Sequence, residues 1–212
     1  MKTSFKRIFC FLPALILAWG AYAQTAEEIL DRVNVQMNGS AEDGLYMVMD
    51  MKLPLLGTYS AAAYSLGDKM RIEMNRDGKR SVSYIDGQTR WEYESEKNTV
   101  TIKTVVKDST ASSPENNLEM LRGITDGYRA QIRKETDEAW YIRCTKTRDN
   151  KDKNDPRHMD LVVLKPDCRL KSMTAKASFI TITMRDFATG VPESKVTFDS
   201  AEFPGAAIID TR

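Results

Sequence analysis

The chain has 212 residues, of which 42% are hydrophobic and 29% are charged, and its formal net charge is +1. Basic and acidic residues are almost equal in number, 31 against 30, and both signs are spread along the chain. This balance argues against nucleic acid as a partner, because a nucleic-acid-binding surface needs a concentrated basic face. The length suffices for one sizeable core, and no Pro/Gly/Ser-rich linker divides it.

The first 23 residues have the pattern of a secretory signal peptide. Three basic residues precede an apolar stretch over 8–17, and Ala21-Tyr22-Ala23 supplies the small residues that a signal peptidase recognises. We expect cleavage before Gln24 and export of a single domain, residues 24–212. Because no later stretch approaches about 18 consecutive apolar residues, we expect the mature chain to be soluble.

One amphipathic helix is predicted at the start of the mature chain. Thr25 and Glu28 have the spacing of a capping box. Apolar residues then recur at helical intervals until Asn38-Gly39, where we expect the helix to end. The residues of this apolar stripe are Ile29, Leu30, Val33 and Met37.

From residue 44 onward the hydrophobic period changes from 3.6 to 2, and turn residues separate short alternating runs. Asp77-Gly78 and Asp86-Gly87 lie between such runs and permit tight hairpins, so neighbouring strands are expected to be antiparallel. We predict about 11–12 strands in meander order, the last around Val196 and Phe198. An open twisted sheet of that size must curl or close.

A polar stretch over 107–117 interrupts the strands. Within it Ser113-Pro114-Glu115 is expected to begin a short second helix, which carries Leu118 and Leu121 and ends at Gly123. The predicted fold is therefore mainly β with a few helices. We expect an open antiparallel half-barrel whose two helices form a lid over an apolar cavity.

Methionine is concentrated on one face of two predicted strands, and methionine adapts to irregular space and varied partners. One interpretation is a pliable cavity that takes lipid chains, and the other is an ordinary core rich in methionine. Aromatic residues on later strands are further candidates for the cavity wall, with cross-strand core pairs as their alternative. The candidate cavity residues are Leu45, Met47, Met49, Met51, Leu53, Met70, Ile72, Met74, Trp91, Tyr93, Trp140 and Ile142.

Cys144 and Cys168 are the only cysteines after the predicted cleavage site. In an oxidising compartment they could form a disulfide, and the sequence does not decide between that bond and two free thiols.

The sequence contains no recognisable catalytic or cofactor motif. His158, the only histidine, adjoins a charged loop, while Glu92 and Glu94 lie on the polar side of a predicted strand. The loop 148–155 holds three carboxylates, but lysines occupy positions where a calcium loop needs oxygen ligands. We expect no catalysis, no cofactor and no metal; a hydrolase with dispersed acidic residues is the alternative.

The segments 67–74, 84–93 and 100–102 resemble the outer-membrane lipoprotein carrier (LolA-like) family. They supply an Arg-bearing strand, a DGxxxWxY hairpin and a VTI strand, and residues 198–210 are similar to the endings of bacterial members. The resemblance implies an unclosed β-barrel with a helical lid, periplasmic location and no catalysis. It also implies acylated lipoproteins or another lipid as cargo, an inner-membrane release machinery and an outer-membrane acceptor.

The sequence departs from the family at its gate, where an arginine is followed by proline. Residues 67–69 read Gly-Asp-Lys instead, so the gate is not carried over, and Arg71 is expected to face solvent. We expect a monomeric carrier. An envelope sensor or assembly factor of the same fold is the first alternative, and a structural surface module is the second.

Overall fold

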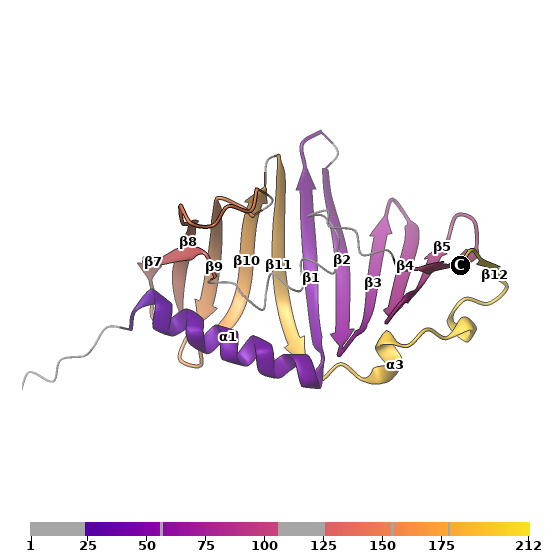
Figure 1. Ribbon diagram of the computed structural model, residues 1–212, viewed down its shortest axis with the longest axis horizontal. Coiled ribbons are helices and arrows are strands. Elements are labelled where there is room, and N and C mark those ends of the chain that lie inside the picture. The colour runs from indigo at the N-terminus through magenta and orange to yellow at the C-terminus, as the bar shows by residue number, and fades with distance from the viewer. Residues whose placement is uncertain (1–23, 56, 106–125, 154, 178) are drawn as a thin grey trace, which may run out of the picture.

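The computed structural model describes residues 24–212 except 56, 106–125, 154 and 178 (Figure 1). The described strands form one sheet of 12 strands in the order β12-β6-β5-β4-β3-β2-β1-β11-β10-β9-β8-β7. Every neighbouring pair is antiparallel except β12 and β6, which are parallel. Because β7 and β12 are separate edges, the sheet is open, and the predicted open, mainly antiparallel sheet is confirmed.

Two meanders build the sheet and meet where β1 pairs with β11. The first consists of β1 (Leu45–Leu53), β2 (Gly57–Leu66), β3 (Lys69–Arg76), β4 (Lys79–Asp86), β5 (Thr89–Glu94) and β6 (Thr99–Thr104). The second consists of β7 (Tyr128–Glu135), β8 (Ala139–Lys146), β9 (His158–Leu164), β10 (Arg169–Ala177) and β11 (Ile180–Thr189).

The two predicted hairpin turns are present. Asp77 and Gly78 join β3 to β4 with φ of 52° and 78°, and Gly87, with φ of 57°, lies between β4 and β5. Positive φ at the central residues matches the right-handed twist of the strands that a tight hairpin joins.

Helix α1 (Ala26–Asp43) begins at the predicted capping box. The Thr25 hydroxyl accepts a hydrogen bond from the Glu28 amide at 3.2 Å, and the Glu28 carboxylate accepts one from the Thr25 amide at 3.1 Å. The predicted end at Gly39 is wrong, because one glycine inside a helix costs only about 1 kcal/mol. The helix ends at Gly44, where a Cβ would lie 2.8 Å from Val191 Cβ and 2.9 Å from the Ser65 carbonyl oxygen.

Helix α1 packs across one face of the sheet, which we call the α1 face. Its apolar stripe (Ile29, Leu30, Val33 and Met37) is buried in one cluster with residues of β1, β2, β3, β8, β9, β10 and β11. Figure 1 shows α1 running along the lower ends of the strands from β7 to β1. Helix α1 therefore shares one buried core with β1 and β3, the two strands that carry the methionine stripes.

The C-terminal segment covers the face opposite the α1 face, over β4, β5 and β6. After β11 the chain forms the short helix α3 (Glu193–Val196), a 3₁₀ turn at Ser200–Glu202, and β12 (Ala207–Asp210). The predicted strand around Val196 and Phe198 is wrong. Val196 ends the helical turn that follows Pro192, and so short a stretch does not distinguish one buried turn from a strand.

The predicted signal peptide and the predicted helix with Leu118 and Leu121 lie outside the described residues. Within the described part of the chain, no helix combines the length and the apolar character needed to cross a bilayer.

Candidate functional site

The two faces of the sheet carry different side chains because strand residues alternate. Strand β3 shows this best: Met70, Ile72 and Met74 lie on the α1 face, and the intervening residues lie on the opposite face. Strands β3, β4, β5 and β6 pair without a register shift, so each residue keeps its face across them.

About half of the predicted methionine surface is packed core. Leu45, Met47, Met49 and Ile72 are each at most 8% exposed and belong to the cluster beneath α1. These residues fit the ordinary-core interpretation, because close-packed methionines leave no space for a ligand.

Other residues of the same stripes stay partly exposed. Five partly exposed apolar side chains lie on the α1 face near the end of the sheet where β1 ends and β11 begins, which is the upper end in Figure 1, and we call them the upper apolar area. They are Met51 and Leu53 of β1, Met74 of β3, and Ile180 and Ile182 of β11. Met70, near the lower end of β3, is also partly exposed.

The α1 face becomes charged beyond β4. Glu92 of β5 lies opposite Ser83, which lies opposite Ile72, so it belongs to this face. Its carboxylate pairs with the Lys103 ammonium at 2.5 Å and with the Arg90 guanidinium at 3.6 Å. The upper apolar area therefore has a polar border toward β5 and β6.

Trp140 and Ile142 of β8 lie in the same buried cluster, 7% and 1% exposed. The Lys165 ammonium lies 4.8 Å from the Trp140 ring centroid, a cation–π contact at the rim of the core. Both residues pack as core.

Trp91 and Tyr93 differ from expectation, because they lie on the face opposite the methionines. Register places Trp91 opposite Tyr84, and Tyr84 opposite Arg71. Trp91 stacks on Phe198 with centroids 5.4 Å apart, and Tyr93 stacks on Phe203 at 4.3 Å. They form a second cluster beneath the C-terminal segment and do not share a surface with Met70 or Met74.

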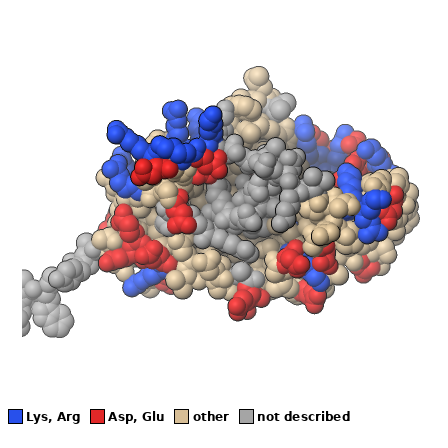
Figure 2. Space-filling model, in the orientation of Figure 1, with Lys and Arg blue, Asp and Glu red and all other residues tan. Residues whose placement is uncertain are grey.

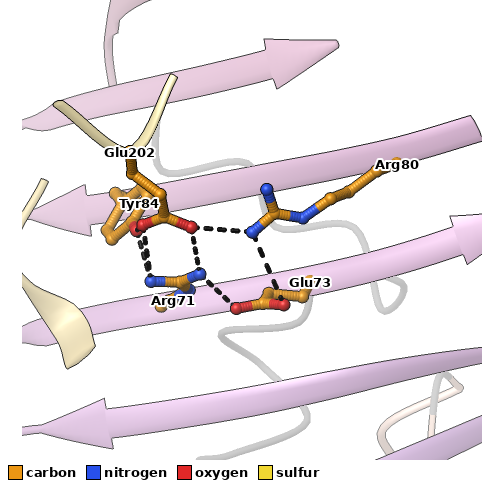
Figure 3. Close-up of polar contacts among 5 residues, drawn as sticks. All are labelled: Arg71, Glu73, Arg80, Tyr84 and Glu202. Carbon is orange, nitrogen blue, oxygen red and sulfur yellow. Dashed lines mark hydrogen bonds and ion pairs between the residues drawn. The ribbon is translucent and has the colours of Figure 1, made fainter. Parts of the chain in front are cut away.

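A polar network, the Glu202 cluster, fastens the C-terminal segment to this second face (Figure 3). It consists of Arg71, Glu73, Arg80, Tyr84 and Glu202. The two oxygens of the Glu202 carboxylate accept bonds from both terminal nitrogens of Arg71, at 2.6 and 2.9 Å. The Arg80 guanidinium donates a hydrogen bond to the same carboxylate at 2.7 Å, and the Tyr84 hydroxyl donates another at 2.5 Å. Arg71 also forms an ion pair with Glu73.

The expectation that Arg71 faces solvent is wrong. The residue is 5% exposed and is the only buried charged residue in the described part of the chain. A buried guanidinium is costly unless it is paired, and a bidentate carboxylate is its best geometric partner. Sequence reasoning missed Glu202 altogether. The available signal was a pair of aromatic residues, Phe198 and Phe203, that flank Asp199 and Glu202.

The cluster sets the ionisation of its members. Burial favours a higher pKa for the Glu202 carboxyl, but hydrogen bonds from Tyr84, Arg71 and Arg80 outweigh it and lower the pKa to about 2. The pKa of Tyr84 is raised, mainly by burial and to a smaller extent by the hydrogen bond that its hydroxyl donates to Glu202. At neutral pH the carboxylate is therefore charged and the phenol is neutral, as the observed bonds require.

We predict that the stabilising effect of Glu202 depends on acid pH. Because folding lowers this pKa, the contribution is complete above the unfolded value of about 4.5 and is lost as the pH falls toward about 2. Urea unfolding of residues 24–212 at several pH values should show the difference between the wild type and Glu202→Gln shrinking across that window. A difference that stays constant from pH 7 to pH 2.5 would contradict the prediction.

The possible disulfide does not form: Cys144 and Cys168 are both buried free thiols. Cys144 pairs with Met159 at one end of β9, whereas Cys168 follows the other end, which is Leu164. Five residues of strand span about 17 Å, beyond the 7 Å that a disulfide tolerates between Cα atoms. Arg32 of α1 donates to the Cys168 sulfur at 3.9 Å.

We predict that both thiols react only after unfolding. Burial raises the pKa of the Cys144 thiol to about 11, which leaves little thiolate at neutral pH. Iodoacetamide without reductant should add two labels in 8 M urea and label the native protein at least tenfold more slowly. Mass measurement that finds no label in urea would demonstrate the disulfide instead.

The candidate catalytic and metal residues do not gather into one site. His158 begins β9 and is exposed, opposite Thr145. Glu94 pairs with the Lys97 ammonium at 2.6 Å, and in the 148–155 loop the Asn150 amide donates to Asp155 at 2.6 Å. Within residues 24–212, apart from the four gaps, no three His, Cys, Asp or Glu side chains form a group that could hold a metal ion.

One pocket of about 460 Å³ lies around the β3–β4 and β5–β6 turns, at the same end of the sheet as the upper apolar area. Met74 lines it together with charged residues, among them Arg76, Lys79 and Glu94. Ligand sites for small molecules are lined mainly by apolar groups. This open, charged pocket is therefore not the predicted apolar cavity.

No family model matches the sequence, and no curated protein matches it. Three solved structures illustrate what the fold is similar to. LprF from Mycobacterium bovis is 10% identical, with 86% of this chain and 97% of LprF covered and a TM-score of 0.50. An uncharacterized conserved protein from Thermus thermophilus is 16% identical, with 88% and 99% covered and a TM-score of 0.47.

A LolA superfamily protein from Nitrosomonas europaea is 13% identical, with 84% of this chain and 99% of that protein covered, and its TM-score is 0.37. The similarity to LprF shows a shared fold. The resemblance to LolA-like carriers read from the sequence motifs stays a prediction.

Proposed function

We propose that this protein is an exported carrier that shields the acyl chains of a lipid or of lipoproteins on the α1 face of its sheet. The upper apolar area supports the proposal, because it continues beyond α1 the same face of the sheet whose core is rich in methionine. Methionine side chains adapt their shape to flexible apolar partners.

The apolar stretch before Gln24 supports the export part of the proposal. In the periplasm, a carrier would move cargo between an inner-membrane release machinery and an outer-membrane acceptor, as LolA-like proteins do. The need is physical: each methylene removed from water contributes about 0.8 kcal/mol, so one chain of about 15 carbons carries roughly 12 kcal/mol. Such cargo does not cross an aqueous gap unshielded.

The two halves of the sheet suit different tasks in this proposal. The Glu202 cluster and the aromatic stacks hold the C-terminal segment on the opposite face, so β3, β4 and β5 are firmly braced. On the α1 face, by contrast, α1 donates hydrogen bonds through Arg32 and Gln36 to the turn between β9 and β10, and its other contacts with the described part of the sheet are apolar. Such contacts can rearrange when cargo enters, because non-directional packing needs no fixed partner geometry.

The decisive experiment is an inventory of bound molecules. The full chain should be expressed with its leader, purified gently from the periplasm and analysed by native mass spectrometry and lipid extraction. We expect stoichiometric lipid or acylated protein. Empty protein that also fails to bind an environment-sensitive apolar dye would overturn the proposal, and co-purification of a membrane regulator without acylated cargo would favour the sensor alternative.

A further inference from the structure

Two neighbouring hairpin turns expose large apolar side chains at one end of the sheet. Leu55, in the turn between β1 and β2, is 105% exposed, and Phe179, just before β11, is 63% exposed. Because β1 pairs with β11, these two turns are adjacent. Figure 1 shows them side by side at the upper end of the sheet, the end at which the upper apolar area lies.

Two exposed lysines lie just behind these turns. Lys52 of β1 and Lys176 of β10 are both opposite Thr181 of β11, so they flank it on the same face, opposite the α1 face. Neighbouring strands lie about 4.8 Å apart, which puts the two backbones about 10 Å from each other. Neither lysine forms an ion pair with a described residue.

The next connection at this end is also basic. Between β8 and β9, residues 147–157 contain four basic residues against three acidic ones, and Lys146 at the end of β8 adds a fifth basic residue. Figure 2 shows Lys and Arg side chains gathered at the upper left, over this connection. Exposed apolar tips with lysines behind them and a basic surface beside them match the layers of an anionic bilayer, whose hydrocarbon lies beneath phosphate groups.

We propose that this end of the sheet docks on anionic membranes, with Leu55 and Phe179 inserting below the headgroups and Lys52 and Lys176 contacting lipid phosphates. A bilayer fits better than a protein partner, because two turn tips offer far less area than the roughly 800 Å² per partner of a stable protein interface. Insertion needs no such area, since each side chain enters the bilayer individually. Docking would also place the upper apolar area next to the lipid surface.

The docking proposal goes beyond the carrier function and can fail separately from it. Binding to vesicles measures the tips alone, while lipid inventory and dye uptake measure the α1 face alone. A protein that binds vesicles but carries no lipid would support docking and refute the carrier function. A protein that carries lipid but does not bind vesicles would support the carrier function and refute docking.

Vesicle flotation with residues 24–212 tests the proposal. We expect binding to vesicles of phosphatidylcholine with 30% phosphatidylglycerol, at least tenfold weaker binding to pure phosphatidylcholine, and weakening by 0.5 M salt. Leu55→Ser with Phe179→Ser should reduce binding at least tenfold. Lys52→Gln with Lys176→Gln should reduce it only on the anionic vesicles.

Val35→Ser is the matched control, because Val35 is 73% exposed on α1, away from these turns, and should leave binding unchanged. Thermal unfolding of each variant checks the fold. An insertion probe supplies a second readout: Leu55→Trp should show a blue-shifted fluorescence increase on anionic vesicles, and Val35→Trp should not. Absence of vesicle binding, equal binding by the serine variants, or concentration-dependent dimers lost on Leu55→Ser would each overturn membrane docking.

Discussion

Glu202→Gln is expected to lower the free energy of unfolding by about 3 kcal/mol at pH 7. The reason is the charge of Arg71, which is 5% exposed and loses its bidentate carboxylate. Breaking a buried pair from one side typically costs about 3–5 kcal/mol, and the remaining contact with Glu73 places this variant at the lower end. Urea unfolding of residues 24–212 measures the change.

The matched control is Glu193→Gln, which removes a carboxylate that pairs with Lys69 at 2.8 Å on the surface of the same segment. Exposed pairs contribute at most about 1 kcal/mol, so this variant should stay close to the wild type. Arg71→Met combined with Glu202→Leu should recover part of the loss, because no unpaired charge then remains buried. Equal stability of the two glutamine variants would mean that the Glu202 cluster does not hold the segment.

Tryptophan fluorescence can detect release of the C-terminal segment from the sheet before the whole protein unfolds. Trp91 stacks on Phe198 within the second cluster, so release of the C-terminal segment exposes the indole to water. We expect Glu202→Gln to shift tryptophan emission to the red at urea concentrations below the main unfolding transition. This shift separates fraying of the segment from global destabilisation.

The sheet could be predicted from the sequence because its signals are local. Alternation along β1 and β3, and the positive φ at Asp77 and Gly78, are properties of a few consecutive residues. The same holds for the capping box at Thr25, since its partners are three residues apart. Such features constrain the chain before any distant contact forms.

The features that the sequence did not reveal depend on distant partners. Arg71 and Glu202 are 131 positions apart, and an isolated arginine on an alternating strand is usually solvated. Their aromatic character makes Trp91 and Tyr93 candidates for the methionine surface, yet they lie on the other face of the sheet. Which face an aromatic residue occupies is set by pairing register, and only the order β3-β4-β5 decides it.

Met51→Gln combined with Met74→Gln is expected to weaken binding of an acyl ligand by about a hundredfold. Both side chains lie on the α1 face, are partly exposed, and belong to the upper apolar area. Burying a methionine against hydrocarbon contributes about 1.5–3 kcal/mol, and a glutamine amide would have to be desolvated there. The two changes together therefore cost about 3 kcal/mol of binding, which corresponds to about a hundredfold in affinity.

Fluorescence titration with a 16-carbon fatty-acid probe measures that affinity. The stability of the variant should fall by less than about 1.5 kcal/mol per site, because both side chains are partly exposed and the glutamine amides stay hydrated in the ligand-free protein. Leu66→Gln combined with Leu164→Gln is the control, since both leucines are partly exposed on the opposite face. If cargo binds the α1 face, only the methionine variant loses affinity, because register keeps the two sets on separate sides of one sheet. Equal losses in both variants would place the ligand elsewhere or reduce the effect to general destabilisation, and no loss in either would remove the upper apolar area from the binding site.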